Sequence, residues 1–253
     1  MNHPIVDAHA HLCDQTFDSD LPEVLDRARQ AGISAIIAVG ENLADARKNL
    51  ALAAVHSMIR PAAGLYPTQL SLESAQEMHA FIRCHREALI AIGEVGLDYW
   101  IIQEESQREL QREIFAGFIA LSTELDLPLN VHSRSAGKHA IEFLLRHSAT
   151  RVHLHAFDGK AQAAMTAVEA GYFFSIPPSI VRSQQKQRLV KLLPLNCLLV
   201  ETDSPVLGPT PDQRNEPANV LLAIKAIAEI KGVSEADVIE SAHENTLRLY
   251  GTQ

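Results

Sequence analysis

Short apolar segments alternate with longer amphipathic segments along the whole chain. Runs of apolar and β-branched residues predict strands near residues 4–8, 33–39, 59–65, 89–95, 128–132, 151–156, 172–176 and 197–202. Apolar positions spaced as on one helix face predict helices near 21–31, 42–57, 73–86, 104–126, 137–147, 160–170, 182–192 and 216–231. A last helix is predicted over 235–249, because Gly232 marks the end of the preceding helix and Ser234 with Asp237 forms a capping-box pattern.

The regular strand–helix alternation predicts an α/β protein with parallel strands and right-handed crossovers. The strands read as continuous apolar runs, as expected for a sheet buried on both faces. Eight strand–helix units and one extra C-terminal helix account for the 253 residues, and a typical (β/α)8 TIM barrel has about 250 residues. We therefore expect a single TIM barrel with an extra C-terminal helix. An open doubly wound sheet is the alternative, but no G-x-G-x-x-G turn follows the first strand. No linker-like tract divides the sequence, so residues 1–253 are expected to form one domain.

Metal-ligand residue types follow five of the predicted strands. They lie in Asp7-Ala8-His9-Ala10-His11, Gly93–Asp98, His132-Ser133-Arg134, His153–Phe157 and Glu201–Pro205. In a barrel, the carboxyl ends of the strands meet at one mouth, where barrel enzymes keep their catalytic residues. We therefore expect one cluster there, made of His9, His11, Glu94, His132, His155 and Asp203.

The spacing of these residues indicates how they could hold metal. His9 and His11 are two residues apart, so both can point to the same side of a strand and bind one ion. Asp203 follows the eighth strand, which neighbours the first in a closed barrel. Glu94 comes from across the barrel, and its two oxygens could bridge two ions, with His132 and His155 completing the second site. Imidazole and carboxylate ligands suit Zn, Mn, Fe or Ni better than Ca.

Each of these residues taken alone also has an ordinary structural interpretation. A single H-x-H pair is a weak signal, and a lone histidine after a strand is more often hydrogen-bonded in the core or a loop. Glu94 could be a helix N-terminal carboxylate, and Asp203 before Ser-Pro could start a turn. The set favours metal binding, because chance would have to place all these groups at the ends of buried strands on one face.

Composition narrows the classes of function. The chain has 31 acidic and 22 basic residues and a net charge of −9, which argues against a protein that holds duplex DNA by bulk positive charge. The cysteines, Cys13, Cys84 and Cys197, form no C-x-x-C pair, so a reducing cytoplasmic compartment is expected. The N-terminus has no basic leader, and no run of about 18 apolar residues occurs, so neither a signal peptide nor a membrane span is expected.

As a set, the motifs resemble the TatD family of metal-dependent hydrolases, within the amidohydrolase-like barrels. The matching segments cover essentially the whole chain, in the family's order: the His9-x-His11 turn, Gly93-Glu94-Val95-Gly96-Leu97-Asp98, His132-Ser133-Arg134, His155-Ala156-Phe157, Glu201-Thr202-Asp203-Ser204-Pro205, Arg214-Asn215-Glu216-Pro217 and Asn245-Thr246. Residues 130–137 and 171–187 are most similar to the third vertebrate branch of TatD-domain-containing proteins, and members of that branch are described as deoxyribonucleases.

The resemblance implies a deoxyribonuclease that cleaves phosphodiester bonds with a binuclear metal site. It implies that one divalent ion is held by His9, His11, Glu94 and Asp203, and the other by Glu94, His132 and His155, the metal being Zn, Mn or Mg. One position departs from the family, whose members often have His-Pro after the third strand where this chain has Tyr66-Pro67. Tyr66 is expected to alter preference or rate, although its hydroxyl can still hydrogen-bond an oxygen ligand.

Two residues are predicted to act on the substrate. Asp203 is expected to be the general base, because it would contact the metal and the attacking water together. Arg134 lies two residues after His132, and its guanidinium fork matches a phosphate, with a surface or ion-pair arginine as the alternative. The acidic surface favours DNA ends, single strands or short oligonucleotides as substrate, and no obligate protein partner is expected.

Two other functions fit the same residues. An amidohydrolase acting on a small amide or ester could use the same ligands to activate water, but it would not require Arg134. A metal-binding barrel without turnover would keep the ligands and show no hydrolysis. In the long loop after the eighth strand, Arg214 and Glu216 are expected to shape the mouth or to cap the helix that follows, and a structural role is favoured for Glu216.

Overall fold

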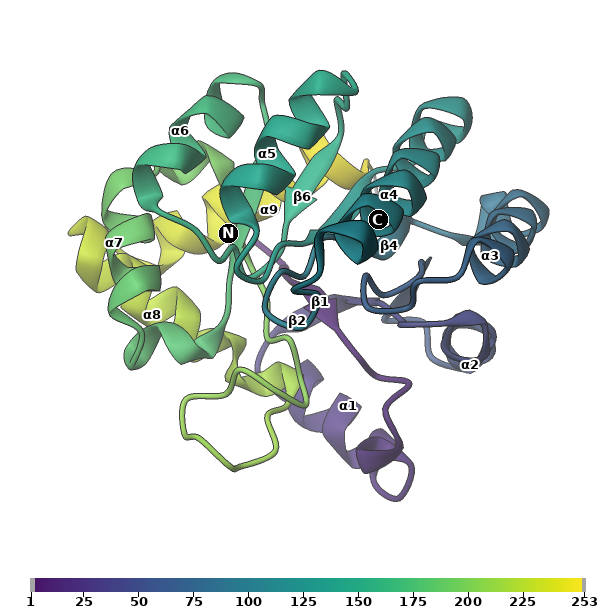
Figure 1. Cartoon of the computed structure of the whole chain (residues 1–253). Coiled ribbons are helices and arrows are strands. Elements are labelled where there is room, and N and C mark those ends of the chain that lie inside the picture. The colour runs from purple at the N-terminus through teal and green to yellow at the C-terminus, as the bar shows by residue number, and fades with distance from the viewer. Residues whose placement is uncertain (1–2, 252–253) are drawn as a thin grey trace.

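A barrel of eight parallel strands forms the centre of the molecule, as the computed structural model shows for residues 3–251 (Figure 1). Neighbouring strands follow the chain order from the first to the eighth, so every connection is a parallel crossover. The strands are β1 (Ile5–Ala10), β2 (Ile33–Ala38), β3 (Ile59–Ala63), β4 (Ala91–Gly96), β5 (Leu129–His132), β6 (Val152–Leu154), β7 (Phe173–Ile176) and β8 (Leu198–Val200). The predicted (β/α)8 barrel is therefore confirmed.

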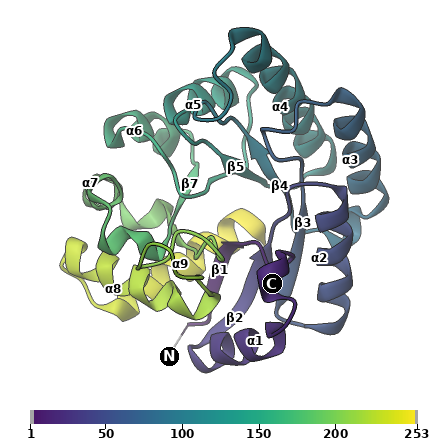
Figure 2. The same cartoon turned by 60° about the horizontal axis from the view of Figure 1, so that its bottom comes forward.

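Helices surround the strands in a ring, which Figure 2 shows from a second direction. They are α1 (Leu21–Gln30), α2 (Leu43–Val55), α3 (Leu72–Cys84), α4 (Glu105–Leu125), α5 (Gly137–Arg146), α6 (Ala161–Glu169), α7 (Gln184–Leu192), α8 (Val220–Lys231) and α9 (Glu235–Tyr250). The extra C-terminal helix is α9, and it packs against β1 and β8. It starts with the predicted capping box, in which Ser234 Oγ accepts from Asp237 N and an Asp237 oxygen accepts from Ser234 N.

Backbone hydrogen bonds close the barrel between its first and last strands. Asp203 N donates to His9 O over 2.9 Å, and His11 N donates to Ser204 O over 2.8 Å. Asp7, inside β1, accepts from Thr202 N at 2.8 Å with one carboxylate oxygen. Together with the strand order from β1 to β8, these contacts exclude the open doubly wound sheet, in which the strand order reverses within the sheet.

Apolar residues fill the space between the strands and the helices, as the continuous apolar strands predict. Ile36, Val95 and Leu154 are fully buried members of the main core. A smaller cluster, with Val6, Ile37 and Leu199, joins strands from opposite ends of the chain. Within the described part of the chain, no helix is both long enough and apolar enough to cross a lipid bilayer.

Candidate metal centre

The structure brings all six predicted ligand residues together at the carboxyl ends of the strands. His9 lies in β1 and His11 directly after it, Glu94 lies in β4, and His132 ends β5. His155 and Asp203 follow β6 and β8. Five of the six are buried, and only His11 is partly open to solvent. The pairing of β1 with β2 is irregular between Asp7 and Ala10, and such irregularities in strands often aim a side chain into a site.

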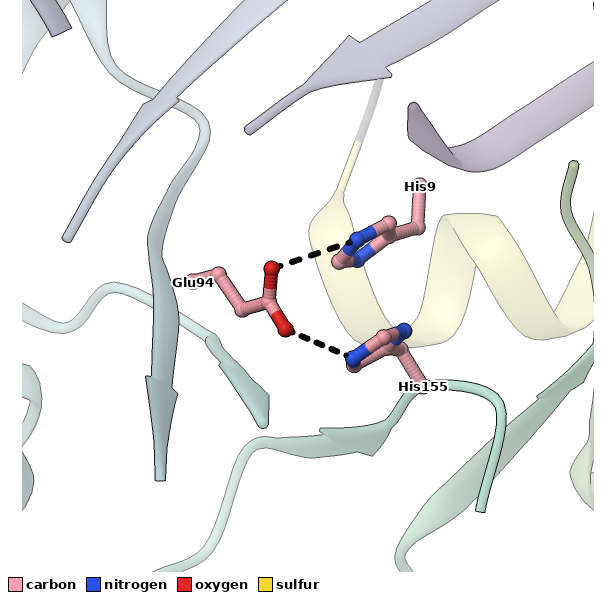
Figure 3. A group of neighbouring side chains, drawn as sticks. All are labelled: His9, Glu94 and His155. Carbon is pink, nitrogen blue, oxygen red and sulfur yellow. Dashed lines mark ion pairs between the residues drawn. The ribbon is translucent and has the colours of Figure 1, made fainter. Parts of the chain in front are cut away.

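Glu94 lies at the centre of this cluster, and its two oxygens face different histidines (Figure 3). Oε1 lies 2.6 Å from His132 Nδ1 and 2.9 Å from His155 Nε2. Oε2 lies 3.2 Å from His11 Nε2 and 3.6 Å from His9 Nε2. One carboxylate therefore borders two groups of imidazole nitrogens, as a bridging ligand would.

The group on the Oε2 side contains His9, His11 and Asp203. The two Nε2 atoms of the histidines lie 3.2 Å apart, and Asp203 Oδ1 is 3.4 Å from one and 3.5 Å from the other. On the Oε1 side, His155 Nε2 lies 3.3 Å from His132 Nδ1. The two sides touch, because the rings of His9 and His155 stack with their centroids 3.8 Å apart.

Hydrogen bonds from outside the cluster fix two of the histidine rings. Asn130 Oδ1 accepts from His9 Nδ1 at 2.9 Å, which leaves His9 Nε2 with its lone pair toward the cluster. Asp98 Oδ2 accepts from His132 Nε2 at 3.0 Å, which leaves the lone pair on His132 Nδ1. Metal-bound histidines commonly donate their other N–H to a carboxylate or carbonyl in this way.

Neither of these two partners was assigned a role from the sequence. Asp98 stands in the matched motif, and Asn130 lies between the apolar residues Leu129 and Val131 of β5. A buried amide inside a strand is the signal that could have pointed to Asn130, because such a group needs a hydrogen-bond partner.

The arrangement fits divalent cations. Asn130 and Asp98 set the tautomers of His9 and His132, so the lone pairs of these rings face carboxylate oxygens of Glu94. A lone pair and a carboxylate oxygen repel each other unless a proton or a metal cation lies between them. Glu94 Oε2 is a buried oxygen that accepts no hydrogen bond from any residue in the described range 3–251. Two groups of three potential ligand atoms lie close enough to hold an ion, namely His9, Glu94 and His155, and His9, His11 and Asp203.

The pKa values of these groups reflect both their burial and their contacts with one another. Burial opposes the charged form of His132, but Asp98 and Glu94 outweigh it and raise its pKa to about 9. Burial lowers the pKa of His155 to about 4, with a contribution from nearby His9. The pKa of Glu94 is well below its usual range, because the surrounding histidines outweigh the effect of burial. The cluster thus contains ionised carboxylate, which is the form that binds metal.

A second buried polar network lies behind the ligands. Glu201 Oε1 accepts from Ala156 N at 2.8 Å, and Oε2 accepts from Ser175 Oγ at 2.6 Å. Ser175 also contacts His153 Nε2, and His153 Nδ1 lies 2.7 Å from the hydroxyl of Tyr250 in α9. Burial raises the pKa of Glu201 to about 8. His153 is therefore a buried residue that links this network to α9.

Two adjoining cavities, of about 550 and 420 Å³, open from the cluster to solvent. Both are lined by His132, His155 and Asp203, and by Tyr66 and Arg134. Arg134 is exposed, and no carboxylate within residues 3–251 forms an ion pair with it. Of the two alternatives for Arg134, the ion-paired arginine does not hold, whereas the exposure of the side chain agrees with a surface arginine, so its role toward phosphate stays a prediction. Tyr66 stands beside His132, with its hydroxyl 3.5 Å from Nε2.

Arg214 and Glu216 do not line these cavities. Arg214 forms a two-pronged ion pair with Asp20, at 2.6 and 2.7 Å, and Glu216 pairs with Arg27 of α1 at 2.6 Å. Both residues therefore tie the long loop after β8 to the N-terminal part of the chain, in keeping with the structural role favoured for Glu216.

The sequence matches the model of a protein family described as TatD related DNase over residues 6–251. It is 43% identical to "Deoxyribonuclease TATDN3" of Homo sapiens, and the alignment covers 97% of this chain and 94% of that protein. It is 31% identical to the "Uncharacterized metal-dependent hydrolase YabD" of Bacillus subtilis, over 97% of this chain and 98% of that protein.

A solved structure of similar shape is that of YJJV, a TatD homolog from Escherichia coli. The two chains superpose with a TM-score of 0.92 at 27% sequence identity, and the match covers 100% of both. The two proteins therefore share the same fold over their whole length.

Proposed function

The chain belongs to the family of TatD-related DNases, and we propose that it is a divalent-metal-dependent deoxyribonuclease that cleaves phosphodiester bonds in single-stranded DNA or at DNA ends. The observation that carries the proposal is the position of Glu94, whose two oxygens face two groups of histidines beside an unpaired arginine. We further propose that residues 1–253 act as one catalytic domain, since ligands come from both ends of the chain.

The proposed ligands form two sets that share Glu94. One set is His9, His11, Glu94 and Asp203, and the other is Glu94, His132 and His155. The chemistry that such ions supply when bound is Lewis acidity toward water and toward a phosphoryl oxygen. Zn, Mn and Mg are all candidates, because mixed imidazole and carboxylate ligands discriminate weakly among them.

The chain's own residues supply the rest of the reaction. Asp203 lies on the cavity wall, and its pKa is lowered because His11 and His9 outweigh the effect of burial. It is therefore ionised and can accept a proton from water. Asn130 and Asp98 orient His9 and His132, so that these rings need no reorganisation during the reaction.

Arg134 and Tyr66 give the cavity its preference for phosphate. The guanidinium can donate two parallel hydrogen bonds to phosphate oxygens, and a neutral amide offers no such charge. This supports phosphodiester hydrolysis over the amidohydrolase alternative. The Tyr66 hydroxyl, at the position where relatives often have histidine, can donate to the same phosphate.

The substrate preference follows from charge and from the shape of the site. The net charge of −9 disfavours a long duplex, so affinity must come from the few phosphates that enter the mouth. We therefore expect weak salt dependence of binding and a preference for short single strands or ends.

The test is an assay of the purified protein on labelled single- and double-stranded DNA, with chelator and with added Mg²⁺, Mn²⁺ or Zn²⁺. Cleavage should require metal, and Asp203→Asn should abolish it, while Glu109→Gln on the exposed face of α4 should behave as wild type. Cleavage that survives chelation or the Asp203→Asn change would contradict the mechanism. Turnover of an amide without cleavage of any nucleic acid would contradict the substrate.

A further inference from the structure

The only tryptophan of the chain, Trp100, stands exposed beside the mouth. Its side chain is 59% exposed, and that of the next residue, Ile101, is 54% exposed. Both lie in the turn that follows β4, the strand that carries Glu94. Large apolar side chains that stay open to water next to a cavity commonly mark a binding surface.

The turn that carries Trp100 is held in place by hydrogen bonds. Asp98 Oδ1 accepts from Trp100 N at 2.9 Å and from Ile101 N at 2.8 Å, and Tyr99 N donates to Arg134 O at 3.0 Å. The other oxygen of Asp98 accepts from His132. The backbone that carries the indole is therefore held in place, and one carboxylate contacts both this turn and a proposed ligand.

Arg134 connects the indole to the cavities. Its guanidinium carbon lies 5.2 Å from the centroid of the Trp100 ring, within the range of a cation–π contact. The same arginine lines both cavities. A cationic group and an exposed aromatic face thus adjoin each other at the edge of the mouth.

We propose that Trp100 and Arg134 form a stacking platform for a nucleobase next to the phosphate that enters the site. The inference rests on the proposed function and adds to it how the strand is held. Aromatic and arginine planes bind unpaired bases by stacking, and every base offers such a face, so the platform tolerates any sequence. A base inside a duplex is already stacked and paired, so the platform favours single strands and frayed ends.

The chain offers a direct reporter, because its tryptophan fluorescence comes from Trp100 alone. The wild-type protein is titrated, with Mn²⁺ present, with a single-stranded phosphorothioate oligonucleotide that resists cleavage. A second titration uses an oligonucleotide of equal length and charge that lacks bases. Stacking predicts quenching by the first and little quenching by the second. Equal responses to the two would overturn the platform.

A kinetic comparison separates the platform from the reaction itself. For cleavable oligonucleotides, wild type should have a KM about tenfold or more lower for the strand with bases than for the abasic strand. Trp100→Leu should bring this ratio near one, and Trp100→Phe should restore most of it. The matched control is Val55→Ala, a 72% exposed apolar residue at the end of α2, which should keep the wild-type ratio.

The outcomes distinguish the two proposals. If Trp100→Leu cleaves DNA with the same ratio of the two KM values as wild type, the platform is overturned and the proposed deoxyribonuclease activity still stands. If wild type cleaves no DNA with any metal, but its fluorescence still distinguishes strands with and without bases, the proposed reaction fails and the platform is supported. Thermal melting should be nearly unchanged in the Trp100 variants, because the side chain is largely exposed.

Discussion

Asn130 Oδ1 lies 2.9 Å from His9 Nδ1, and this contact determines which nitrogen of His9 faces the other ligands. The amide of Asn130 is itself oriented, because its Nδ2 donates to Ala8 O at 3.2 Å. Its oxygen must therefore accept from His9, and the lone pair of the imidazole lies on Nε2. The ring is thus set for metal binding before any ion arrives.

We expect Asn130→Leu to weaken metal binding by about 10- to 100-fold, because loss of such an outer partner frees the ring and the tautomer. Calorimetric titration of Mn²⁺ into the chelator-treated protein measures the change. The control is Asn245→Leu, which removes a buried asparagine of α9 that donates to Leu195 O and Leu198 O, at the amino end of β8 and so at the opposite end of the barrel from the site. It should lower stability and leave metal affinity unchanged. Equal metal affinity in the two variants would contradict the role of Asn130.

Glu94→Gln should lower the number of bound metal ions per chain. The amide keeps the size of the side chain but can offer only one oxygen and no charge, whereas Glu94 faces histidines with both oxygens. Elemental analysis of protein dialysed against a metal buffer gives the ratio directly. Wild type should hold two ions, Glu94→Gln one or fewer, and Glu109→Gln the wild-type number. An unchanged ratio in Glu94→Gln would remove its bridging role.

Gly96→Ala should destabilise the protein severely and disturb the site. Gly96 has φ of +142°, and a Cβ there would lie 2.1 Å from His132 O. Backbone strain and overpacking each cost about 1–3 kcal/mol, so we expect a loss of roughly 3 kcal/mol or more in urea unfolding. Gly171→Ala is the matched control, since Gly171 has φ of +82° and nothing within 4 Å of such a Cβ. It should cost about 1–2 kcal/mol from strain alone.

Tyr172 makes the stability of the folded chain depend on pH far from the site. Burial raises its pKa from the ordinary value of 10.0 to about 12, and its hydroxyl donates to Ala149 O at 2.8 Å. Between pH 10 and 12, the phenol ionises in the unfolded chain but keeps its proton in the folded chain. The stabilisation that Tyr172 provides is therefore fully present below pH 10 and is lost as the pH rises toward 12. Over this range the free energy of unfolding falls by roughly 2–3 kcal/mol.

Tyr172→Phe tests this dependence by urea unfolding at several pH values. At pH 8 the variant should be less stable than wild type by about 1 kcal/mol, because a buried hydrogen bond is lost. The difference should shrink and then reverse between pH 10 and 12, because the variant lacks the Tyr172 phenol, which ionises more readily in the unfolded chain than in the folded one. A constant difference over this range would contradict the raised pKa.

The barrel could be predicted from the sequence because local patterns of apolar and polar residues predict each strand and helix. Apolar runs such as Ile33–Ala38 alternate with amphipathic helices, and Gly232 and Ser234 mark where α8 ends and α9 begins. The position of the candidate ligands followed from the same reasoning, since parallel strands bring their carboxyl ends to one mouth. His9 and His11 lie with their Nε2 atoms 3.2 Å apart, as their spacing suggests.

The details of the site could not be predicted, because they depend on distances between strands that are far apart in sequence. The sequence allows Glu94 to bridge two ions, but it does not indicate that the carboxylate lies within 2.6 Å of His132 and 3.2 Å of His11. Nor does it reveal that Arg134 lies over Trp100, with no ion pair to any carboxylate among residues 3–251. These contacts arise from the register and packing of β4 and β5, which local periodicity does not encode.

The hydrogen bonds across the barrel seam have a consequence for biosynthesis. His9 and Asp203 are joined through their own backbones at that seam, although 194 positions separate them in the chain (203 − 9). Because the chain is synthesised from its N-terminus, most of it must have left the ribosome before the backbones of His9 and Asp203 can form this hydrogen bond. An unfinished chain that stops before residue 203 lacks Asp203 and with it one wall of the ligand cluster. We therefore expect nascent and truncated chains to lack the proposed nuclease activity, which would require the complete barrel.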